Sequence, residues 1–101
     1  MPGAGQQGTG PTVRRRCQIA GRVQMVGFRA FASHHGRRLQ LRGWVRNGAR
    51  GQVEVVVEGP ETQVEAFLAL LEEGPPAAEV ESMLVANEAA DAPLPEFRAL
   101  S

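Results

Sequence analysis

The residues best suited to chemistry lie in one short segment, 21–29, between a candidate strand and a candidate helix. The first N–H groups of a helix have no partner within it, and the helix dipole leaves that end partly positive. Gly21 and Gly27 let the chain bend tightly and approach a ligand. Arg29, in the first turn, adds a positive charge and a planar set of donors that suits phosphate or carboxylate. The segment is therefore a candidate anion site.

A second candidate is Asn47, which ends a strand-like run and carries a donor and an acceptor that could hold a water molecule. No carboxylate pair, Ser–His or Cys–His arrangement or metal-ligand spacing accompanies it. His34 and His35 are adjacent and point to different sides of a helix, so no metal is expected.

This sparse set of residues includes no general acid that could protonate a poor leaving group. It therefore suits a substrate with a good leaving group, which departs without protonation. A carboxyl–phosphate anhydride releases a carboxylate whose pKa is about 4 to 5. Backbone N–H groups and Arg29 would hold its phosphoryl oxygens, and Asn47 would hold the attacking water. The substrate phosphate itself would take the proton of that water.

The elements that must position these residues follow from the apolar periodicity. Strands are expected over 14–21, 42–47, 52–58 and 79–86, helices over 28–41 and 61–73, and a short terminal strand within 96–100. In 79–86 the apolar phase shifts, as a β-bulge would cause. The order predicts a ferredoxin-like α+β sandwich, an antiparallel sheet with both helices on one face and a short C-terminal fifth strand. That fold brings segment 21–29 and Asn47 to the same end of the molecule.

The composition fits one soluble domain, with 101 residues, of which 43% are apolar and 22% charged. We expect a flexible Gly-rich tail over 1–13 and one domain over 14–101. No apolar run is long enough to span a membrane, and the first residues lack the apolar stretch of a secretory signal. A cytoplasmic monomer is therefore expected. Cys17 stands alone and is interpreted as a small buried residue.

The formal net charge is zero, but the charges are unevenly distributed along the chain. Every basic residue is arginine, mostly between Arg14 and Arg50, whereas acidic residues begin at Glu54. A basic patch for a small anion or nucleic acid is one interpretation. The favoured interpretation is that most of these arginines lie on solvated faces, with Arg29 as the exception.

Both candidate regions of the sequence resemble motifs of the acylphosphatase family. The family loop Gly-x-Val-Gln-Gly-Val-Gly-(Phe/Tyr)-Arg is matched at Gly21, Val23, Gln24, Val26, Gly27, Phe28 and Arg29, and the second motif, Gly-Trp-Val-Arg-Asn, at residues 43–47. The resemblance covers Arg15 to the C-terminus. It implies a ferredoxin-like fold, no metal or cofactor, and hydrolysis of acyl phosphates to carboxylate and inorganic phosphate.

The resemblance also assigns site residues. The catalytic arginine corresponds to Arg29 and the water-positioning asparagine to Asn47. The phosphate-binding backbone N–H groups correspond to Gln24, Met25, Val26, Gly27, Phe28 and Arg29. Met25 stands where the family has glycine. If that position requires a positive φ, methionine is strained there by about 1 kcal/mol or more.

Two other functions compete with an acylphosphatase. One is a non-catalytic anion-binding module, because domains resembling acylphosphatase also begin larger carbamoyl-transferring maturation proteins. The other is an RNA-binding ferredoxin-like domain, which would display aromatic residues on its central strands. Trp44 is the only aromatic residue on a predicted strand in the middle of this chain, so no nucleic-acid partner is expected.

Overall fold

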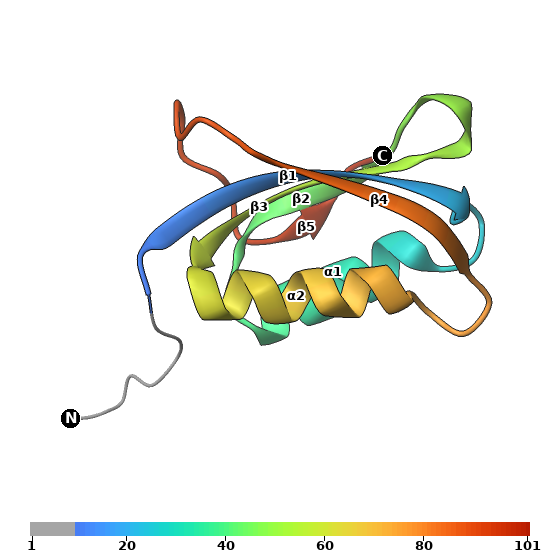
Figure 1. Ribbon diagram of the computed structural model, residues 1–101, viewed down its shortest axis with the longest axis horizontal. Coiled ribbons are helices and arrows are strands. Elements are labelled where there is room, and N and C mark those ends of the chain that lie inside the picture. The colour runs from blue at the N-terminus through green and yellow to red at the C-terminus, as the bar shows by residue number, and fades with distance from the viewer. Residues whose placement is uncertain (1–9) are drawn as a thin grey trace.

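The computed structural model describes residues 10–101 and contains a five-stranded sheet in the order β4-β1-β3-β2-β5. Two helices cover one face of this sheet (Figure 1). β3 is antiparallel to β1 and β2, β4 is antiparallel to β1, and β5 is parallel to β2. The predicted ferredoxin-like α+β fold is therefore confirmed, with a fifth strand that makes the sheet mixed. The elements are β1 (Thr12–Arg22), α1 (Phe28–Arg38), β2 (Arg42–Asn47), β3 (Val53–Pro60), α2 (Glu61–Glu73), β4 (Glu79–Asn87) and β5 (Arg98–Ala99).

β1 begins at Thr12, earlier than the predicted start at position 14. The reason is that β3 continues to Pro60, which pairs with Thr12. The carbonyl of Pro11 accepts a hydrogen bond from the N–H of Glu61 at 2.9 Å. The end of the expected tail thus belongs to the domain, whereas residues 1–9 of that tail lie outside the described residues.

The core lies between the sheet and the helices. Alternation on β3 buries Val53, Val55 and Val57 completely against the helices, as alternating apolar residues on a half-buried strand should. On α2 the predicted apolar face is buried: Val64, Phe67, Leu68 and Leu71. The side chain of Cys17 on β1 is also fully buried, which confirms its interpretation as a core residue.

Gly36 lies inside the continuous helix α1, where the C-terminal segment packs directly against it. Glycine within a helix costs about 1 kcal/mol relative to alanine. A Cβ atom at Gly36 would lie 2.5 Å from the ring of Phe97. The buried Phe97 ring in turn meets the ring of Phe67 edge-on, with 5.1 Å between centroids. The missing side chain at Gly36 therefore lets the C-terminal segment reach the edge of the sheet beside β2.

A β-bulge lies at the end of β1 that leads to the candidate site. Ala20 pairs with Ser82, but Gly21 pairs with Val80, so Glu81 is an extra residue on β4. This confirms the bulge expected from the shifted apolar phase in 79–86. A bulge increases the local twist of the strand pair just before the chain turns toward α1.

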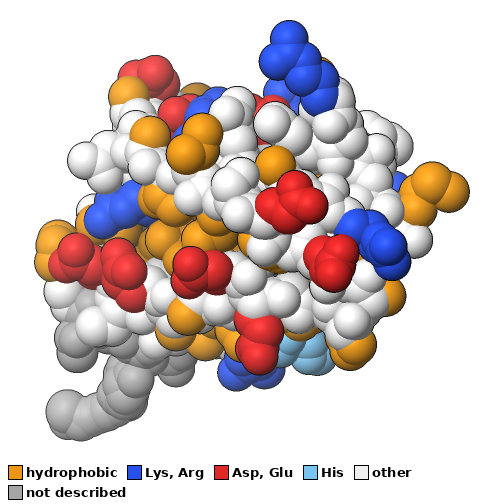
Figure 2. Space-filling view, turned by 45° about the vertical axis from the view of Figure 1, so that its right-hand side comes forward, with side chains coloured by type: hydrophobic (Ala, Val, Ile, Leu, Met, Phe, Trp, Pro, Cys, Tyr) orange, Lys and Arg blue, Asp and Glu red, His pale blue; other side chains and the backbone are white. Residues whose placement is uncertain are grey.

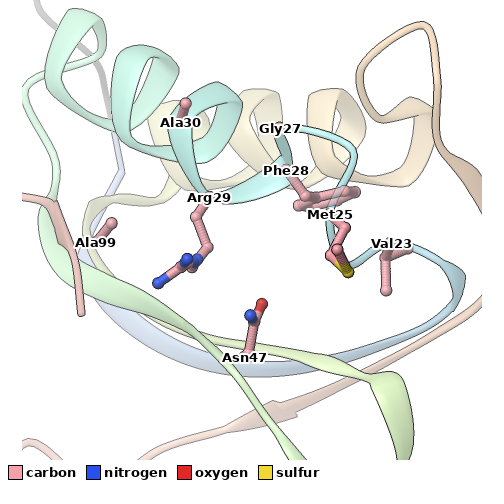
Figure 3. Close-up of a pocket in the computed structure, with 8 residues that line it drawn as sticks. All are labelled: Val23, Met25, Gly27, Phe28, Arg29, Ala30, Asn47 and Ala99. Atoms are coloured by element: carbon pink, nitrogen blue, oxygen red, sulfur yellow. The ribbon is translucent and has the colours of Figure 1, made fainter. Parts of the chain in front are cut away.

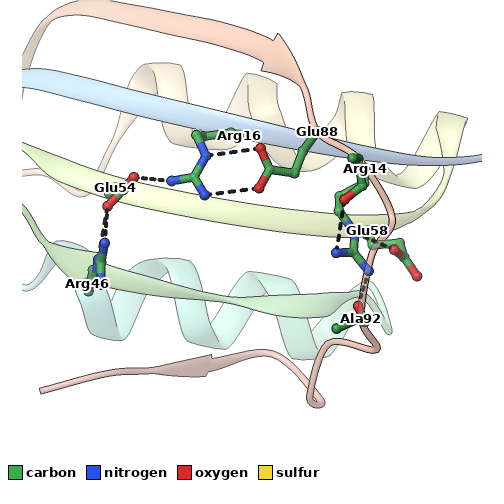
Figure 4. A network of polar contacts seen from close by, with 8 residues as sticks. Arg14, Arg16, Arg46, Glu54, Glu58, Glu88 and Ala92 are labelled. Atoms are coloured by element: carbon green, nitrogen blue, oxygen red, sulfur yellow. Dashed lines mark hydrogen bonds and ion pairs between the residues drawn. The ribbon is translucent and has the colours of Figure 1, made fainter.

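The uncovered face of the sheet carries a network of ion pairs (Figure 4). The Arg16 guanidinium contacts Glu54 and donates to Glu88 at 3.0 and 3.1 Å, and Arg46 shares Glu54 at 2.8 Å. The hydrogen bonds from Arg16 lower the pKa of Glu88, and those same bonds raise the pKa of Arg16. The Arg46 guanidinium lies 4.9 Å from the centre of the Trp44 ring. These arginines therefore form ion pairs with carboxylates of neighbouring parts of the sheet.

Two further arginines hold the segment that crosses from β4 to β5. Arg14 donates to the carbonyl of Ala92 at 2.6 Å, and Arg42 donates to the carbonyl of Leu94 at 2.6 Å. Because β4 and β5 occupy opposite edges of the sheet, this segment must traverse the sheet (Figure 1). Arginine donors from β1 and β2 fix its path.

Six of the eleven acidic residues lie on α2 and β4. Figure 2 shows carboxylate side chains scattered over one face of the molecule around apolar surface. On β4 the side chains of Leu84 and Val85 are 68% and 43% exposed. Within residues 10–101, neither helix has the length and apolar character that a membrane crossing requires.

Candidate active site

A pocket of about 440 Å³ lies where the β1–α1 loop faces the end of β2 (Figure 3). Arg29 and Asn47 enter it from different elements, and Figure 3 shows their side chains pointing toward each other across it. The fold thus brings together the two side chains that the sequence singled out. The lining residues are Val23, Met25, Gly27, Phe28, Arg29, Ala30, Asn47 and Ala99.

The backbone of the β1–α1 loop (residues 23–27) contains two residues in the left-handed conformation. Gly27 caps α1 with φ 82° and ψ 16°, and Met25 has φ 63°. Left-handed residues that alternate with ordinary ones turn successive N–H groups toward a common concave side. A Cβ at Gly27 would meet nothing within 4 Å, so glycine serves its conformation rather than its space.

The first turn of α1 supplies further donors. The N–H of Phe31 donates to the carbonyl of Gly27 at 3.0 Å, which closes this turn. The N–H groups of Phe28, Arg29 and Ala30 precede it and have no acceptor within the helix. No acidic residue occupies the first turn. The partly positive helix end therefore faces the pocket without a local negative charge.

The Arg29 side chain is held by the C-terminal segment. Its Nη1 donates to the carbonyl of Leu100 at 2.8 Å. The N–H of Leu100 donates in turn to the carbonyl of Val45 on β2 at 2.8 Å. A guanidinium has five N–H donors, so this bond leaves others for a ligand. Sequence reasoning did not find Leu100, because a backbone carbonyl has no sequence signature.

Gln24 uses its side chain to join the loop to the β2–β3 hairpin. Its Nε2 donates to the carbonyl of Gly48 at 3.2 Å and to that of Gln52 at 2.8 Å. The sequence suggested only a backbone role for this residue. The two bonds fix the loop relative to Asn47, which comes directly before Gly48. The sequence could not predict these bonds, because Gly48 and Gln52 lie beside Gln24 only in the folded chain.

Asn47 is the last residue of β2 and has an exposed side chain. It pairs with Val53 of β3 across the hairpin, whose turn is the short 3-10 segment Ala49–Gly51. The backbone of Asn47 is therefore fixed by the sheet, while its amide group is free to point into the pocket. An amide in this position can donate to one partner and accept from another.

The pocket carries the positive charge of Arg29. Among residues 10–101, those that line it include no carboxylate, histidine or cysteine, and no three His, Cys, Asp or Glu side chains gather to hold a metal ion. Burial raises the pKa of the Cys17 thiol to about 12, so it remains protonated and unreactive. His34 is exposed and His35 is half-buried, and neither lines the pocket. The arrangement can bind an anion and orient a water molecule.

Met25 occupies the left-handed region, with φ 63°. This conformation costs a residue other than glycine about 1 to 2 kcal/mol. The Met25 side chain is 99% exposed, so burial does not offset that cost. The conditional expectation of strain at this position is therefore met.

Comparisons with known proteins agree with this architecture. The acylphosphatase family model matches residues 15–99. An acylphosphatase from Syntrophotalea carbinolica is 47% identical over 76 residues, which are 75% of this chain and 83% of that protein. The crystal structure of acylphosphatase from Bacillus subtilis is 31% identical and superposes with a TM-score of 0.83, covering 88% of this chain and 99% of the other.

A unit of the same fold also occurs within a longer protein. The crystal structure of HypF from T. kodakarensis is 32% identical, with a TM-score of 0.76 over 86% of this chain, but over only 12% of HypF. The match to the family model extends over most of the chain, and the Syntrophotalea carbinolica relative is nearly half identical. The chain therefore belongs to the acylphosphatase family of hydrolases.

Proposed function

We propose that this chain hydrolyses acyl phosphates by direct attack of a water molecule on phosphorus, with Arg29 and Asn47 as the catalytic residues. The observation that carries the proposal is the position of Arg29, Asn47 and unpaired helix-start N–H groups around one pocket. None of the residues described around that pocket has a carboxylate or imidazole side chain. Positioning and charge stabilisation are then the available means of catalysis.

The phosphoryl group binds to the loop and to Arg29. The backbone N–H groups of residues 24–29 donate to its non-bridging oxygens, as helix-start N–H groups do for many phosphates. The guanidinium of Arg29, held by the carbonyl of Leu100, adds a full positive charge. Charge spread over the phosphoryl oxygens in the transition state is stabilised by both.

Asn47 orients the attacking water. The water oxygen forms a bond to phosphorus while the bond between phosphorus and the carboxyl oxygen breaks. The electron pair of that bond leaves with the carboxylate, and a phosphoryl oxygen takes the proton of the water. The products are a carboxylate and inorganic phosphate. The released carboxylate has a pKa of about 4 to 5, so its departure needs no general acid.

A non-catalytic anion-binding module is the second candidate. The likeness to HypF favours it, because there a unit of this fold spans a small part of a longer chain. Such a module would bind inorganic phosphate in calorimetry and release no phosphate from an acyl phosphate. Strain at Met25 in the loop would then be the residue-level reason for the lost activity.

The experiment is hydrolysis of benzoyl phosphate in ¹⁸O-labelled water, with and without EDTA. We expect phosphate release at the same rate in both, with the label in phosphate and none in benzoate. A label in benzoate would mean attack at the carbonyl carbon and contradict the proposal. Loss of activity in EDTA would refute a metal-independent reaction. Phosphate binding without turnover would establish the binding module instead.

A further inference from the structure

Met25 combines features that stability does not explain. Its backbone is left-handed, with φ 63°, and its side chain is 99% exposed. A strained residue whose side chain makes no buried contact lowers the free energy of unfolding relative to glycine. Met25 nevertheless lines the pocket. Strain at a ligand site is a reason to look for function in the side chain.

The position of Met25 is at the rim of the pocket. Val23 and Phe28 lie at its base, since their side chains are 1% and 2% exposed. A bound acyl phosphate must therefore extend its organic part toward solvent, past the exposed lining residues. Among the described residues on that rim, Met25 has the one apolar side chain larger than a methyl group, beside Gly27, Ala30 and Ala99.

The pocket also separates polar from apolar contacts. Figure 3 shows the Arg29 guanidinium on one side of Asn47 and the Met25 thioether on the other. Arg29 attracts the phosphoryl group, whereas the thioether offers nothing to an anion. Methionine is flexible and polarisable, and its sulfur makes favourable contacts with aromatic rings. An apolar acyl group is the part of the substrate that this side chain can recognise.

We propose that Met25 is a specificity-determining residue that packs on the acyl group and favours apolar, above all aromatic, acyl phosphates over short ones. This inference rests on the proposed hydrolysis of acyl phosphates. It adds a substrate class to a site whose other groups contact only phosphate and water.

The test compares kcat/KM for benzoyl phosphate and acetyl phosphate in the wild type and in Met25→Gly, Met25→Gln and Met25→Leu. The ratio between the two substrates cancels their intrinsic reactivity and any general change in the loop. Met25→Gly removes side chain and strain together, whereas Met25→Gln keeps the length and the strain but is polar. The ratio of benzoyl to acetyl phosphate should fall by about threefold to tenfold in both, the size of a sulfur–aromatic contact. It should fall less in Met25→Leu, which loses the sulfur but keeps an apolar side chain.

An unchanged ratio in Met25→Gly and Met25→Gln would overturn the inference, even if both substrates became equally slower. If the wild type hydrolysed neither substrate, the proposed function itself would fail. The two failures are therefore distinguishable, because the first requires an active wild type.

Discussion

At the scale of single residues, hydrogen bonds to backbone carbonyls hold the pocket together. Gln24 bonds the loop to the hairpin through Gly48 and Gln52, and Arg29 bonds to Leu100. None of these acceptors is a side chain. The pocket therefore depends on the relative placement of three backbone segments, and small displacements of any of them should reach the reacting atoms.

Gln24→Met should weaken both stability and activity. The substitution keeps the length of the side chain but removes both hydrogen bonds to the hairpin. We expect a loss of about 1 kcal/mol in the free energy of unfolding. The value of kcat/KM should fall by about tenfold to 100-fold, because the loop is no longer fixed relative to Asn47. Urea titration and steady-state kinetics with benzoyl phosphate measure these quantities.

Gln63→Met is the matched control for this prediction. Gln63 also donates its Nε2 to a backbone carbonyl, that of Leu39, at 3.4 Å, but on α2 and outside the pocket. Its substitution should leave kcat/KM unchanged. Equal activities of the Gln24 and Gln63 variants would show that the bond from the loop to the hairpin has no role in catalysis.

Leu100→Pro should lower activity by weakening the contact that positions the Arg29 guanidinium. Proline removes the N–H that donates to Val45, so the carbonyl that holds Arg29 is no longer fixed against β2. We expect kcat/KM to fall by about tenfold or more. Leu100→Ala keeps both backbone groups and should retain activity. If both variants hydrolyse benzoyl phosphate alike, Leu100 does not position Arg29.

Arg29 and Asn47, which line one pocket, could be selected from the sequence because their side chains have chemistry that fits a phosphate site. The partners that orient the loop and Arg29 could not. Leu100 contributes only a carbonyl, and Gln24 reaches two carbonyls that come next to it only in the folded chain. The strain at Met25 could be predicted only conditionally. The sequence shows that methionine replaces the family glycine, but it does not show that φ is positive at this position.

At the scale of elements, α1 and the C-terminal segment depend on one close contact. Gly36 makes room for the ring of Phe97, which precedes β5. Helix propensity by itself would favour alanine at this position. Only the path of the C-terminal segment explains why glycine occupies this position. The bulge in β4, in contrast, was predictable, because the apolar phase of residues 79–86 records it directly.

Gly36→Ala should destabilise the protein despite the better helix former. Its Cβ would lie 2.5 Å from the Phe97 ring, so the ring or the helix must move. Overpacking of a core costs about 1 to 3 kcal/mol, more than the gain in propensity of about 1 kcal/mol. In a Phe97→Leu background the same substitution should cost less or become favourable. Urea titrations of the four proteins give the coupling, and a stabilising Gly36→Ala in the wild-type background would contradict the packing.

At the scale of the whole molecule, the unusual composition leaves few side chains that change their protonation state at alkaline pH. The basic residues are all arginine, and the chain has no tyrosine. Between about pH 9 and pH 11, the buried thiol of Cys17 is therefore the side chain whose ionisation differs between the folded and unfolded states. Burial raises its pKa to about 12 in the folded protein, above an ordinary value of about 8.5.

The free energy of unfolding should therefore fall as the pH rises through this range. Because the folded pKa is the higher one, the stabilisation is complete below the unfolded pKa and is lost as the pH approaches the folded value. We expect a slope of about 1.4 kcal/mol per pH unit in urea titrations between about pH 9.5 and pH 11. Cys17→Ala should abolish the slope. A slope that persists in this variant would assign the effect to another group.

In the proposed reaction, Asn47 orients the water that attacks phosphorus, while Arg29 and the loop hold the phosphoryl group. The most direct test is kcat for benzoyl phosphate with Asn47→Ala, together with the affinity of the same variant for inorganic phosphate. We predict that kcat falls by about 100-fold or more, as the loss of a positioning group should cause. The Kd for phosphate should stay within about threefold, less than 1 kcal/mol. A folded Asn47→Ala protein with the wild-type kcat would rule out that Asn47 orients the attacking water.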